Sequence, residues 1–423
     1  MNYYKIDGQL CCSHRGDLPF EHVTEPKKAE PVVFLFERDP KSCRASFCVN
    51  DPELMYQEKE DISWINKNKL YEYLEEEKLK GGADPVPSFL DKAIKNGMVK
   101  AVNLSHSAFH DIIKETPNSD KKRVNILAIG DVGSNLLTGL HLLGGDVISS
   151  IGICDISDKV TARWEFEENQ IAYPWNYDAL PEVKIVSREH LFDCDVFVFV
   201  ASAGIPPVGS DVKDVRMYQF DKNSKIVAQY AKQARDTHFK GLFAVVSDPV
   251  DPLAKAAFLA SNTDEQGNFD NKGLRPEQIQ GYGLGVMNAR AAYFAKRDER
   301  FKQFLTEGRS FGPHGQDLVV ADSVHNYNDE LSKELTQLTV TANLHMRAIG
   351  FKPFVAPAFS SGALSILLTL RGEWHCGSVF LGGIYMGVKN RYTACGLETE
   401  ILPMSVQLFE RIRAAEENLK KIN

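Results

Sequence analysis

Two glycines and a distant aspartate form the first chemical pattern of the chain. Gly130 and Gly133 follow an apolar, β-branched run that begins at Val124, and Asp155 ends a second apolar run, 22 residues beyond Gly133. The order is strand, glycine turn, helix, strand and acid. It lets backbone N–H groups at a helix start meet a pyrophosphate while a carboxylate accepts hydrogen bonds from ribose hydroxyls. The pattern predicts a dinucleotide site; the alternative is a tight β–α turn in another doubly wound protein.

The residues within and around this turn refine the prediction. Asp131 and Val132 lie between the two glycines, and the charge of Asp131 disfavours a pyrophosphate unless its side chain points away. Ala128 replaces the first glycine of the usual triplet, and we expect it to permit the close turn with a negative φ. Asp155 favours NAD over NADP, because a carboxylate accepts hydroxyl hydrogen bonds but repels a 2′-phosphate.

Length and charge limit the classes of function. At 423 residues the chain has room for two or three domains. Its net charge of −8 gives no reason to expect nucleic acid or an anionic membrane as a partner. The N-terminus lacks an apolar signal region, and no apolar run approaches the length of a transmembrane helix. We therefore expect a soluble, cytoplasmic protein.

The cysteines do not form the pattern of a disulfide scaffold. Four of the eight, Cys11, Cys12, Cys43 and Cys48, lie within the first 50 residues, near two histidines. Such a set could assemble a structural zinc site, but its spacing contains no C-x-x-C pair. Buried thiols are the favoured interpretation, and we expect no metal.

Alternating apolar runs and helical patterns indicate how the dinucleotide turn is positioned. We expect strands at 124–129, 150–154, 183–186, 195–201 and 242–247, with helices at 134–143, 161–170 and 217–236. This alternation predicts a parallel sheet with right-handed crossovers. After residue 250 we expect helices at 252–260, 284–306, 328–348 and 360–371, and an antiparallel pair around 376–389 and 392–401.

The N-terminal part does not follow this regular alternation of strands and helices. Strands are expected at 31–38 and 43–50, a helix at 61–79, and shorter helices at 86–98 and 105–114. No chemistry is assigned to this part. The predicted fold is α/β: an N-terminal α/β or α+β appendage (1–120), a Rossmann-type doubly wound NAD-binding domain (121–250) and an α+β substrate domain (251–423).

Further motifs occur in a fixed order after the glycine turn. They are AGIP (203–206), SDPVDP (247–252), GLGVMNAR (283–290), GPHGQD (312–317) and GGIYMGVK (382–389). In this order the sequence resembles the lactate/malate dehydrogenase family of L-2-hydroxyacid dehydrogenases over residues 124 to 415, with an extra N-terminal region. The resemblance implies hydride transfer to or from NAD, a small carboxylate-bearing substrate, and a homodimer or homotetramer.

The resemblance also implies roles for individual residues. His314 matches the family's general acid/base, and imidazole suits proton transfer near neutral pH. Arg290 matches the arginine that binds the substrate carboxylate. Arg216 is the best match for the loop arginine that polarises the carbonyl, with Lys213 as the alternative. The residues expected to contact the cofactor are Gly130, Asp131, Val132, Gly133, Asp155, Ala203 and Gly204.

Three departures from the family pattern bear on the reaction. Met287 stands where an aspartate orients the histidine, and Asp248 replaces the asparagine that contacts the substrate oxygen. Pro207–Val208 replaces the arginine that selects dicarboxylic acids, which argues against malate or oxaloacetate as the substrate. Our hypothesis is that Asp248 lies close to His314 and serves as its charge partner. In the competing interpretation, Asp248 faces a cationic substrate group, such as an amine or iminium.

These residues predict an NAD-dependent oxidoreductase that acts between a hydroxyl or amine and a carbonyl or imine of a small carboxylic acid. A second interpretation is an NAD-binding sensor or structural protein whose catalytic set has decayed, as Met287 and Asp248 would allow. The third is an NAD-dependent glycosidase of the same fold. Those enzymes carry a metal-binding cysteine after the fifth strand, where this chain has Asp248.

Overall fold

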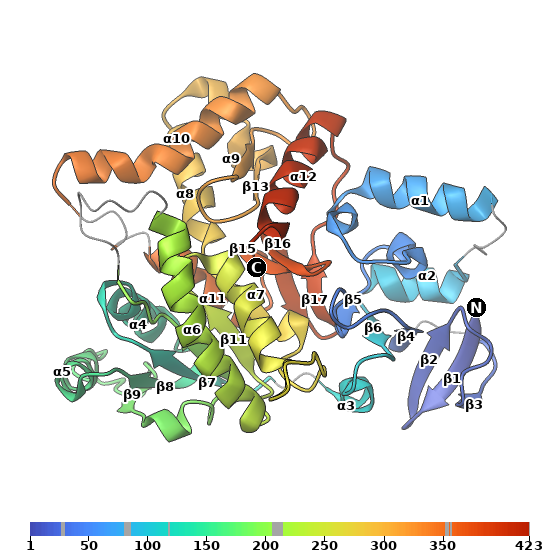
Figure 1. Cartoon of the computed structure of the whole chain (residues 1–423), viewed down its shortest axis with the longest axis horizontal. Coiled ribbons are helices and arrows are strands. Elements are labelled where there is room, and N and C mark those ends of the chain that lie inside the picture. The colour runs from blue at the N-terminus through green and yellow to red at the C-terminus, as the bar shows by residue number, and fades with distance from the viewer. Residues whose placement is uncertain are drawn as a thin grey trace.

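Two β-sheets form the framework of the molecule, one in the N-terminal region and one in the rest of the chain (Figure 1). The computed structural model describes residues 1–26, 30–79, 86–116, 119–204, 215–351, 355 and 358–422, apart from the side chains of 215–218. Among the described residues, every helix is too short or too polar to span a bilayer.

In the described residues, nine strands form the larger sheet, which we call the main sheet. Their order is β17-β16-β15-β12-β11-β10-β7-β8-β9. The parallel part comprises β7 (Lys122–Leu127), β8 (Ile148–Cys154), β9 (Glu182–Ile185), β10 (Val196–Phe199), β11 (Leu242–Val245) and β12 (Ile279–Gly281). From β7, the strands β8 and β9 follow outward on one side, and β10, β11 and β12 follow outward on the other side. This confirms the doubly wound sheet, whose ligand crevice lies where the order reverses, between β7 and β10.

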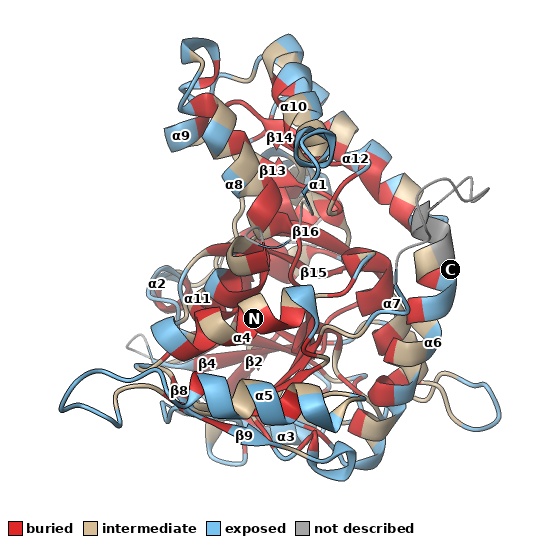
Figure 2. Ribbon diagram, turned by 90° about the vertical axis from the view of Figure 1, so that its left-hand side faces the viewer, coloured by how far each residue is buried: buried red, intermediate tan, exposed pale blue. Residues whose placement is uncertain are grey.

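Helices cover both faces of the parallel part. They are α4 (Asp131–Leu143), α5 (Asp158–Glu168), α6 (Val215–Asp236) and α7 (Val250–Ser261). All four β10 residues, Val196–Phe199, are buried, as expected for a strand covered on both faces. Apolar clusters fill the space between the sheet and its helices, and Figure 2 shows this buried core.

The remaining strands extend the same sheet. β15 (His375–Leu381) pairs antiparallel with β12 through Ser378 and Gly281, and β16 (Ile384–Thr393) and β17 (Gly396–Thr399) follow. The main sheet therefore runs without a break across residue 250, and the division into domains there stays a prediction. Instead of one strand at 376–389, β15 turns into β16 at Gly382 and Gly383. Their φ angles of 61° and 92° suit a tight hairpin turn.

The other elements of the C-terminal half are mainly helical. They are α8 (Leu284–Ala295), α9 (Phe304–Glu307), β13 (Arg309–Phe311), β14 (Val319–Ala321), α10 (Asp329–Ala348), a π-helical turn (Phe359–Leu364), α11 (Ser365–Leu370) and α12 (Val406–Lys420). The expected single helix at 284–306 is wrong. Asp298 leaves the helical conformation, and its carboxylate accepts a hydrogen bond from the Arg300 N–H, which starts a separate 3-10 turn.

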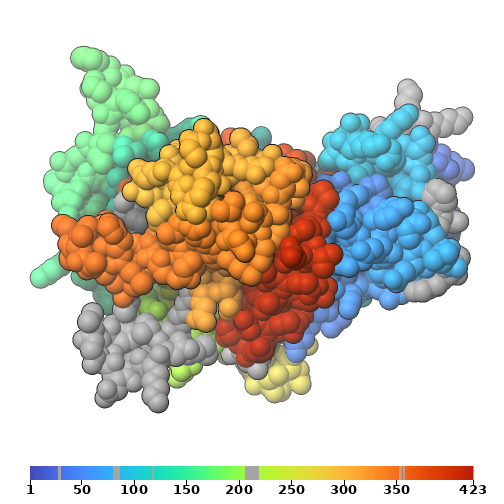
Figure 3. Space-filling model, turned by 90° about the horizontal axis from the view of Figure 1, so that it is seen from above, coloured from blue at the N-terminus to red at the C-terminus, as the bar shows by residue number. Residues whose placement is uncertain are grey.

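The N-terminal region has its own sheet. Its strands, in the order β3-β1-β2-β4-β6-β5, are β1 (Asn2–Ile6), β2 (Gln9–Ser13), β3 (Glu21–His22), β4 (Val32–Phe36), β5 (Ser46–Cys48) and β6 (Val99–Asn103). The helices are α1 (Lys67–Leu79), α2 (Ser88–Lys95) and α3 (Phe109–Lys114). The expected helix at 86–98 ends early because the chain turns at Gly97 (φ 64°) into β6. Figure 3 shows this region, in blue, beside the C-terminal segment in red.

The cysteines of the N-terminal region are buried thiols. Cys11, Cys12, Cys43 and Cys48 are each almost fully buried, and burial raises the pKa of Cys11 to about 12. Within the described ranges, no three His, Cys, Asp or Glu side chains come together in a way that could hold a metal ion. Cys11, Cys12 and Cys43 contribute to the apolar cores of this region.

Candidate active site

The glycine turn lies between β7 and α4, at the point where the strand order reverses. A Cβ at Gly133 would lie 2.1 Å from the Ala128 carbonyl oxygen, so only glycine permits this close approach of helix and strand. Ala128 has φ +76°, and the expected negative angle is wrong. Its N–H still donates to the Cys154 carbonyl (2.8 Å), and the chain must then reverse within a few residues to start α4. A left-handed residue makes that reversal.

The start of α4 leaves room for an anion. Gly130 is the N-cap residue, no side chain caps the helix, and a Cβ added at Gly130 would meet nothing within 4 Å. Amides of the first helical turn require an acceptor from outside the helix, and a pyrophosphate supplies one. Asp131 is exposed and Val132 is half-buried at this end. The turn thus fits the phosphate portion of a dinucleotide.

Asp155 is fixed beside the turn by the backbone. Its Oδ2 accepts a hydrogen bond from the Ile129 N–H (2.8 Å), and its Oδ1 accepts one from the Ser157 N–H (3.0 Å). Each carboxylate oxygen has a second acceptor position. Asp155 can therefore accept ribose hydroxyls as well, at the edge of β8 where the nucleotide motif places it.

The turns after β10 and β11 are joined by one buried side chain. Asn223 on α6 accepts a hydrogen bond from the Ala203 N–H (2.8 Å) and donates to the Asp248 carbonyl oxygen (2.8 Å). Gly204, with φ +92°, follows Ala203. Asn223 thus holds both turns at the same edge of the sheet. Pro207, Val208, Lys213 and the Arg216 side chain lie outside the described residues.

His314 lies in the loop between β13 and β14 and has a defined tautomer. Its Nδ1 is 2.8 Å from the Gly283 carbonyl oxygen, which can only accept, so Nδ1 carries the hydrogen. A Cβ at Gly283 would lie 2.9 Å from the His314 Cβ, so the glycine allows this approach. The ring presents Nε2 on its other side, 3.8 Å from Asp248 Oδ1.

Asp248 is the half-exposed member of this pair. Its side chain is 54% exposed and that of His314 is 23% exposed. The two groups are close enough to interact electrostatically but too far apart for a direct hydrogen bond. Asp248 therefore faces the Nε2 side of the ring. The Gly283 carbonyl, rather than Asp248, orients the ring.

Arg290 and Met287 lie on α8, three residues apart. Met287 is buried in an apolar cluster, and its Sδ is 3.7 Å from Arg290 Nη1. Burial lowers the pKa of Arg290, and the negative charge of Asp248 opposes that shift. The structure thus brings Arg290 near Asp248, which lies beside His314, and the Met287 thioether is buried next to the Arg290 guanidinium.

Asp251, which the sequence analysis did not select, lies behind the histidine. It stands in the first turn of α7 and is 3% exposed, and its Oδ2 accepts a hydrogen bond from the His314 N–H (3.1 Å). Burial raises the pKa of Asp251 to about 6, against the opposing effect of its hydrogen bonds and of His314. An acid at a helix N-terminus was visible in the sequence, but its burial against the His314 loop was not.

Comparisons with known proteins find relatives over part of the chain. The chain is 27% identical over 196 residues to L-lactate dehydrogenase 2 of Staphylococcus aureus strains JH9 and Newman. The match covers 46% of this chain and 54% of each relative, so the chain spans about half the length of the curated relatives it matches. No family model matches the sequence.

Solved structures cover more of the chain. A malate dehydrogenase from Picrophilus torridus aligns with a TM-score of 0.57 and 18% identity over 71% of this chain and 96% of its own. A minor L-lactate dehydrogenase from Enterococcus mundtii gives a TM-score of 0.56 and 18% identity over 72% and 98%. A lactate dehydrogenase from a deep-sea metagenome library gives a TM-score of 0.55 and 16% identity over 72% and 98%.

The strand order of the main sheet, the ordered motifs and these alignments lead to one assignment. The chain has the fold of these lactate and malate dehydrogenases, with an additional N-terminal region.

Proposed function

We propose that the protein is an NAD-dependent oxidoreductase that transfers a hydride between nicotinamide and a small 2-hydroxy or 2-oxo acid, or its amino or imino analogue. The observation that carries the proposal is the approach of His314 Nε2 to Asp248 beside Arg290, at the sheet edge that also holds the glycine turn. A base, a carboxylate-binding cation and a dinucleotide turn are the groups this reaction needs.

Each residue of the proposed site has a separate task. NAD supplies or accepts the hydride when it is bound. The Arg290 guanidinium binds the substrate carboxylate and so orients the reacting carbon. His314 gives a proton to the substrate oxygen, or removes it in the reverse direction, through Nε2, while its Nδ1–H stays on the Gly283 carbonyl.

Asp248 can act with either class of substrate. With an oxo acid, its negative charge would lie beside Nε2 of His314, the group that donates the proton. With an imino acid, it would pair directly with the cationic nitrogen. A half-exposed carboxylate at 3.8 Å from Nε2 serves either arrangement, so the choice is a matter for a substrate screen.

NAD is the proposed cofactor. Asp155 supports NAD over NADP because its fixed carboxylate would repel a 2′-phosphate. The residues that would surround the phosphates and the nicotinamide end of the cofactor are Gly130, Asp131, Val132, Gly133, Ala203 and Gly204. The proposal also includes a homodimer or homotetramer, a cytoplasmic location, and no nucleic-acid or membrane partner. These three parts of the proposal rest on the resemblance and the acidic composition.

Calorimetric titration of NAD(H) and NADP(H) into the full chain tests the cofactor. We expect micromolar NAD binding that is lost in Asp155→Ala, with NADP much weaker. Reduction of a panel of 2-oxo acids, with and without ammonia, then identifies the substrate, and Arg290→Lys should raise KM for any substrate found. A protein that binds neither cofactor contradicts the proposal.

The second candidate is a decayed NAD-binding sensor, which the buried Met287 favours because no carboxylate occupies that position. NAD binding of undiminished affinity without turnover of any 2-oxo or 2-imino acid would support it. Retention of His314 with a defined tautomer beside Arg290 argues against it.

A further inference from the structure

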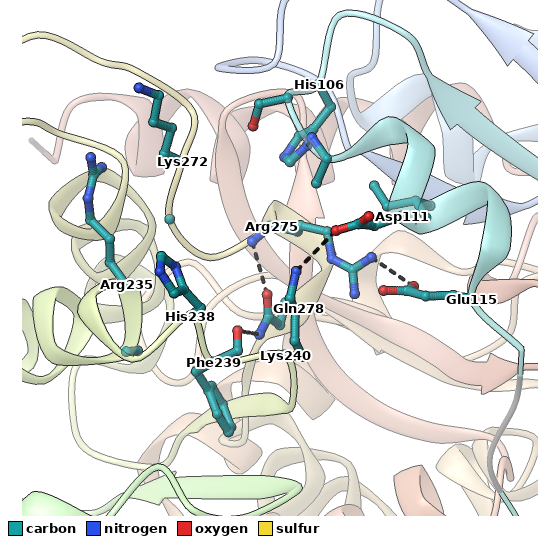
Figure 4. A pocket seen from close by; sticks show the side chains of 15 residues that line it. His106, Asp111, Glu115, Arg235, His238, Phe239, Lys240, Lys272, Arg275 and Gln278 are labelled. Carbon is teal, nitrogen blue, oxygen red and sulfur yellow. Dashed lines mark hydrogen bonds and ion pairs between the residues drawn. The ribbon is translucent and has the colours of Figure 1, made fainter.

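A cavity lies between the N-terminal region and the main sheet, away from the dehydrogenase site. Its volume is about 80 Å³, and it is bounded by the segment around α3, the end of α6 and the chain before β12 (Figure 4). At about 10–15 Å³ for each water-sized probe, it has room for about five to eight waters. A phosphate group, with five heavy atoms, therefore fits within it.

A buried hydrogen-bond donor faces this cavity. His106 is 2% exposed, and its Nδ1 accepts a hydrogen bond from the Ala108 N–H (3.1 Å), so the ring hydrogen is on Nε2. Among the described residues, Nε2 has no hydrogen-bond partner. Burial, together with the charges of Arg275 and Lys240, lowers the pKa of His106 to about 4, so the ring is neutral at pH 7. A buried N–H without an acceptor is costly, and an acceptor in the cavity would remove that cost.

Cationic groups outnumber carboxylates in the cavity wall. The charged lining residues are Arg235, Lys240, Lys272 and Arg275 against Asp111 and Glu115. Arg235 pairs with Asp270, and Arg275 lies 4.0 Å from Glu277 and 2.8 Å from Glu115, so Lys240 and Lys272 are the cations left for a ligand. Two such ammonium groups beside one opening favour an anion.

The carboxylates of the lining do not neutralise every cation. Glu115 is 2.8 Å from Arg275, whereas the exposed Lys240 is 3.6 Å from Asp111, a separation too long for a hydrogen bond. In the part of the chain that the structure describes, Lys272 has no carboxylate within ion-pair distance and is exposed at the mouth. Lys240 and Lys272 are thus placed to turn toward a ligand.

We propose that this cavity binds a phosphate group, with His106 Nε2–H, Lys240, Lys272 and Arg275 as its donors. The source is either inorganic phosphate or a small phosphomonoester whose remaining atoms extend past Lys272 into solvent. The ligand would contact α3 and the end of α6 together. It would therefore strengthen the attachment of the N-terminal region to the dinucleotide-binding sheet.

Calorimetric titration of inorganic phosphate into the full chain, in chloride buffer at pH 7, tests the proposal. We expect saturable binding that weakens about tenfold in Lys240→Gln, as loss of one charge-assisted contact predicts. Lys232→Gln is the matched control, because Lys232 is exposed on α6 and does not line the cavity. His106→Gln should also weaken binding, provided that its circular dichroism matches the parent protein.

Parallel titrations identify the ligand class. Tighter binding of glycerol phosphate than of phosphate indicates a phosphomonoester, and equal or weaker binding indicates the free ion. Phosphate binding that shifts the His106 ring ¹⁵N resonances would support the site even if His106→Gln fails to fold. The proposal is overturned by absent saturable heat, by equal weakening in Lys232→Gln and Lys240→Gln, or by acetate that binds as tightly as phosphate.

Discussion

At the scale of single residues, His314 lies between two carboxylates in different surroundings. Asp248 is half-exposed and faces the ring nitrogen Nε2, whereas Asp251 is buried and holds the backbone N–H of His314. The first can act on a bound substrate, and the second can act only through the position of the loop. Two groups of the same type therefore have separable effects on activity and on stability.

Substitution of Asp248 tests its effect on activity. A charge 3.8 Å from Nε2, in surroundings between water and a protein surface, contributes about 1–3 kcal/mol. We expect Asp248→Asn to lower kcat of the proposed reaction by about tenfold to a hundredfold, measured by NADH absorbance. Met287→Leu, which conserves volume at a buried apolar position, should change kcat by less than about threefold. Equal effects of both substitutions would contradict a role for the Asp248 charge.

Asp251 has a consequence for the pH dependence of stability. Its pKa is about 6 in the folded protein and 3.8 in its ordinary environment, so between these values the folded state binds more protons than the unfolded state. Stability is therefore lost as pH rises through this window, by up to about 3 kcal/mol.

Asp251→Asn should remove that loss, because the amide still accepts the His314 N–H and does not ionise. Urea unfolding from about pH 4 to about pH 7 should show the variant gaining stability relative to the parent as pH rises. Asp236→Asn, at an exposed position on α6, is the control. Parallel stability curves for Asp251→Asn and the parent would contradict the assignment.

At the scale of elements, the two glycines of the β7–α4 turn have different reasons to be glycine. Gly133 has the Ala128 carbonyl oxygen against it, so its small size serves packing within the protein. Gly130 has open space above it and φ −79°, which any residue can adopt. The missing side chain at Gly130 therefore leaves space for a ligand that approaches the helix from outside.

Alanine substitutions separate these two reasons. Gly133→Ala should lower the free energy of unfolding by about 1–3 kcal/mol through overpacking. Gly130→Ala should change it by less than about 1 kcal/mol, since only the N-cap preference is altered. The same Gly130→Ala protein should bind NAD at least about tenfold more weakly, because the methyl group occupies the space for the phosphates. Unfolding in urea and calorimetry measure the two effects, and unchanged NAD affinity in Gly130→Ala would exclude this turn as the cofactor site.

The elements also show what could be predicted from the sequence. Buried β-branched strands and the helices between them were predicted because their periodicity is local. The strand β12 has only three residues, too few to show a periodicity. The hairpin of β1 and β2 depends on the turn at Asp7–Gly8, a dipeptide whose positive φ angles suit a hairpin turn. The order of motifs indicated His314, Arg290 and Asp248. Asp251 could not be found in this way, because its burial depends on a loop 63 residues away.

At the scale of the whole molecule, the N-terminal region is attached through buried polar contacts. Glu277, next to β12, accepts hydrogen bonds from the Ala45 N–H (3.0 Å) and the Ser46 hydroxyl (2.9 Å). Burial raises the pKa of Glu277, and the charge of Arg275 opposes that shift. Ile62 and Ile65 enter an apolar cluster formed largely by the C-terminal half. The region is therefore part of one folded unit with the main sheet.

Removal of the buried carboxylate tests this attachment. Glu277→Ala leaves the Ala45 N–H and the Ser46 hydroxyl without their acceptor, and we expect the free energy of unfolding to fall by about 3 kcal/mol. Limited proteolysis should then cut the N-terminal region first. Glu115→Ala removes a half-exposed partner of Arg275 and should cost less than about 1 kcal/mol. Equal losses in the two variants would mean that burial of Glu277 contributes nothing to the attachment.

The contact between the two ends of the chain has a consequence for protein synthesis. Asn50 donates a hydrogen bond to the Thr399 carbonyl, 349 residues later. At about 5–20 residues per second, a ribosome needs between about 20 s and about 70 s to make the intervening chain. During that interval the nascent N-terminal region carries an unfilled docking face that includes Ile62 and Ile65. Slow translation would therefore lengthen the period in which this face can bind a chaperone or another nascent chain.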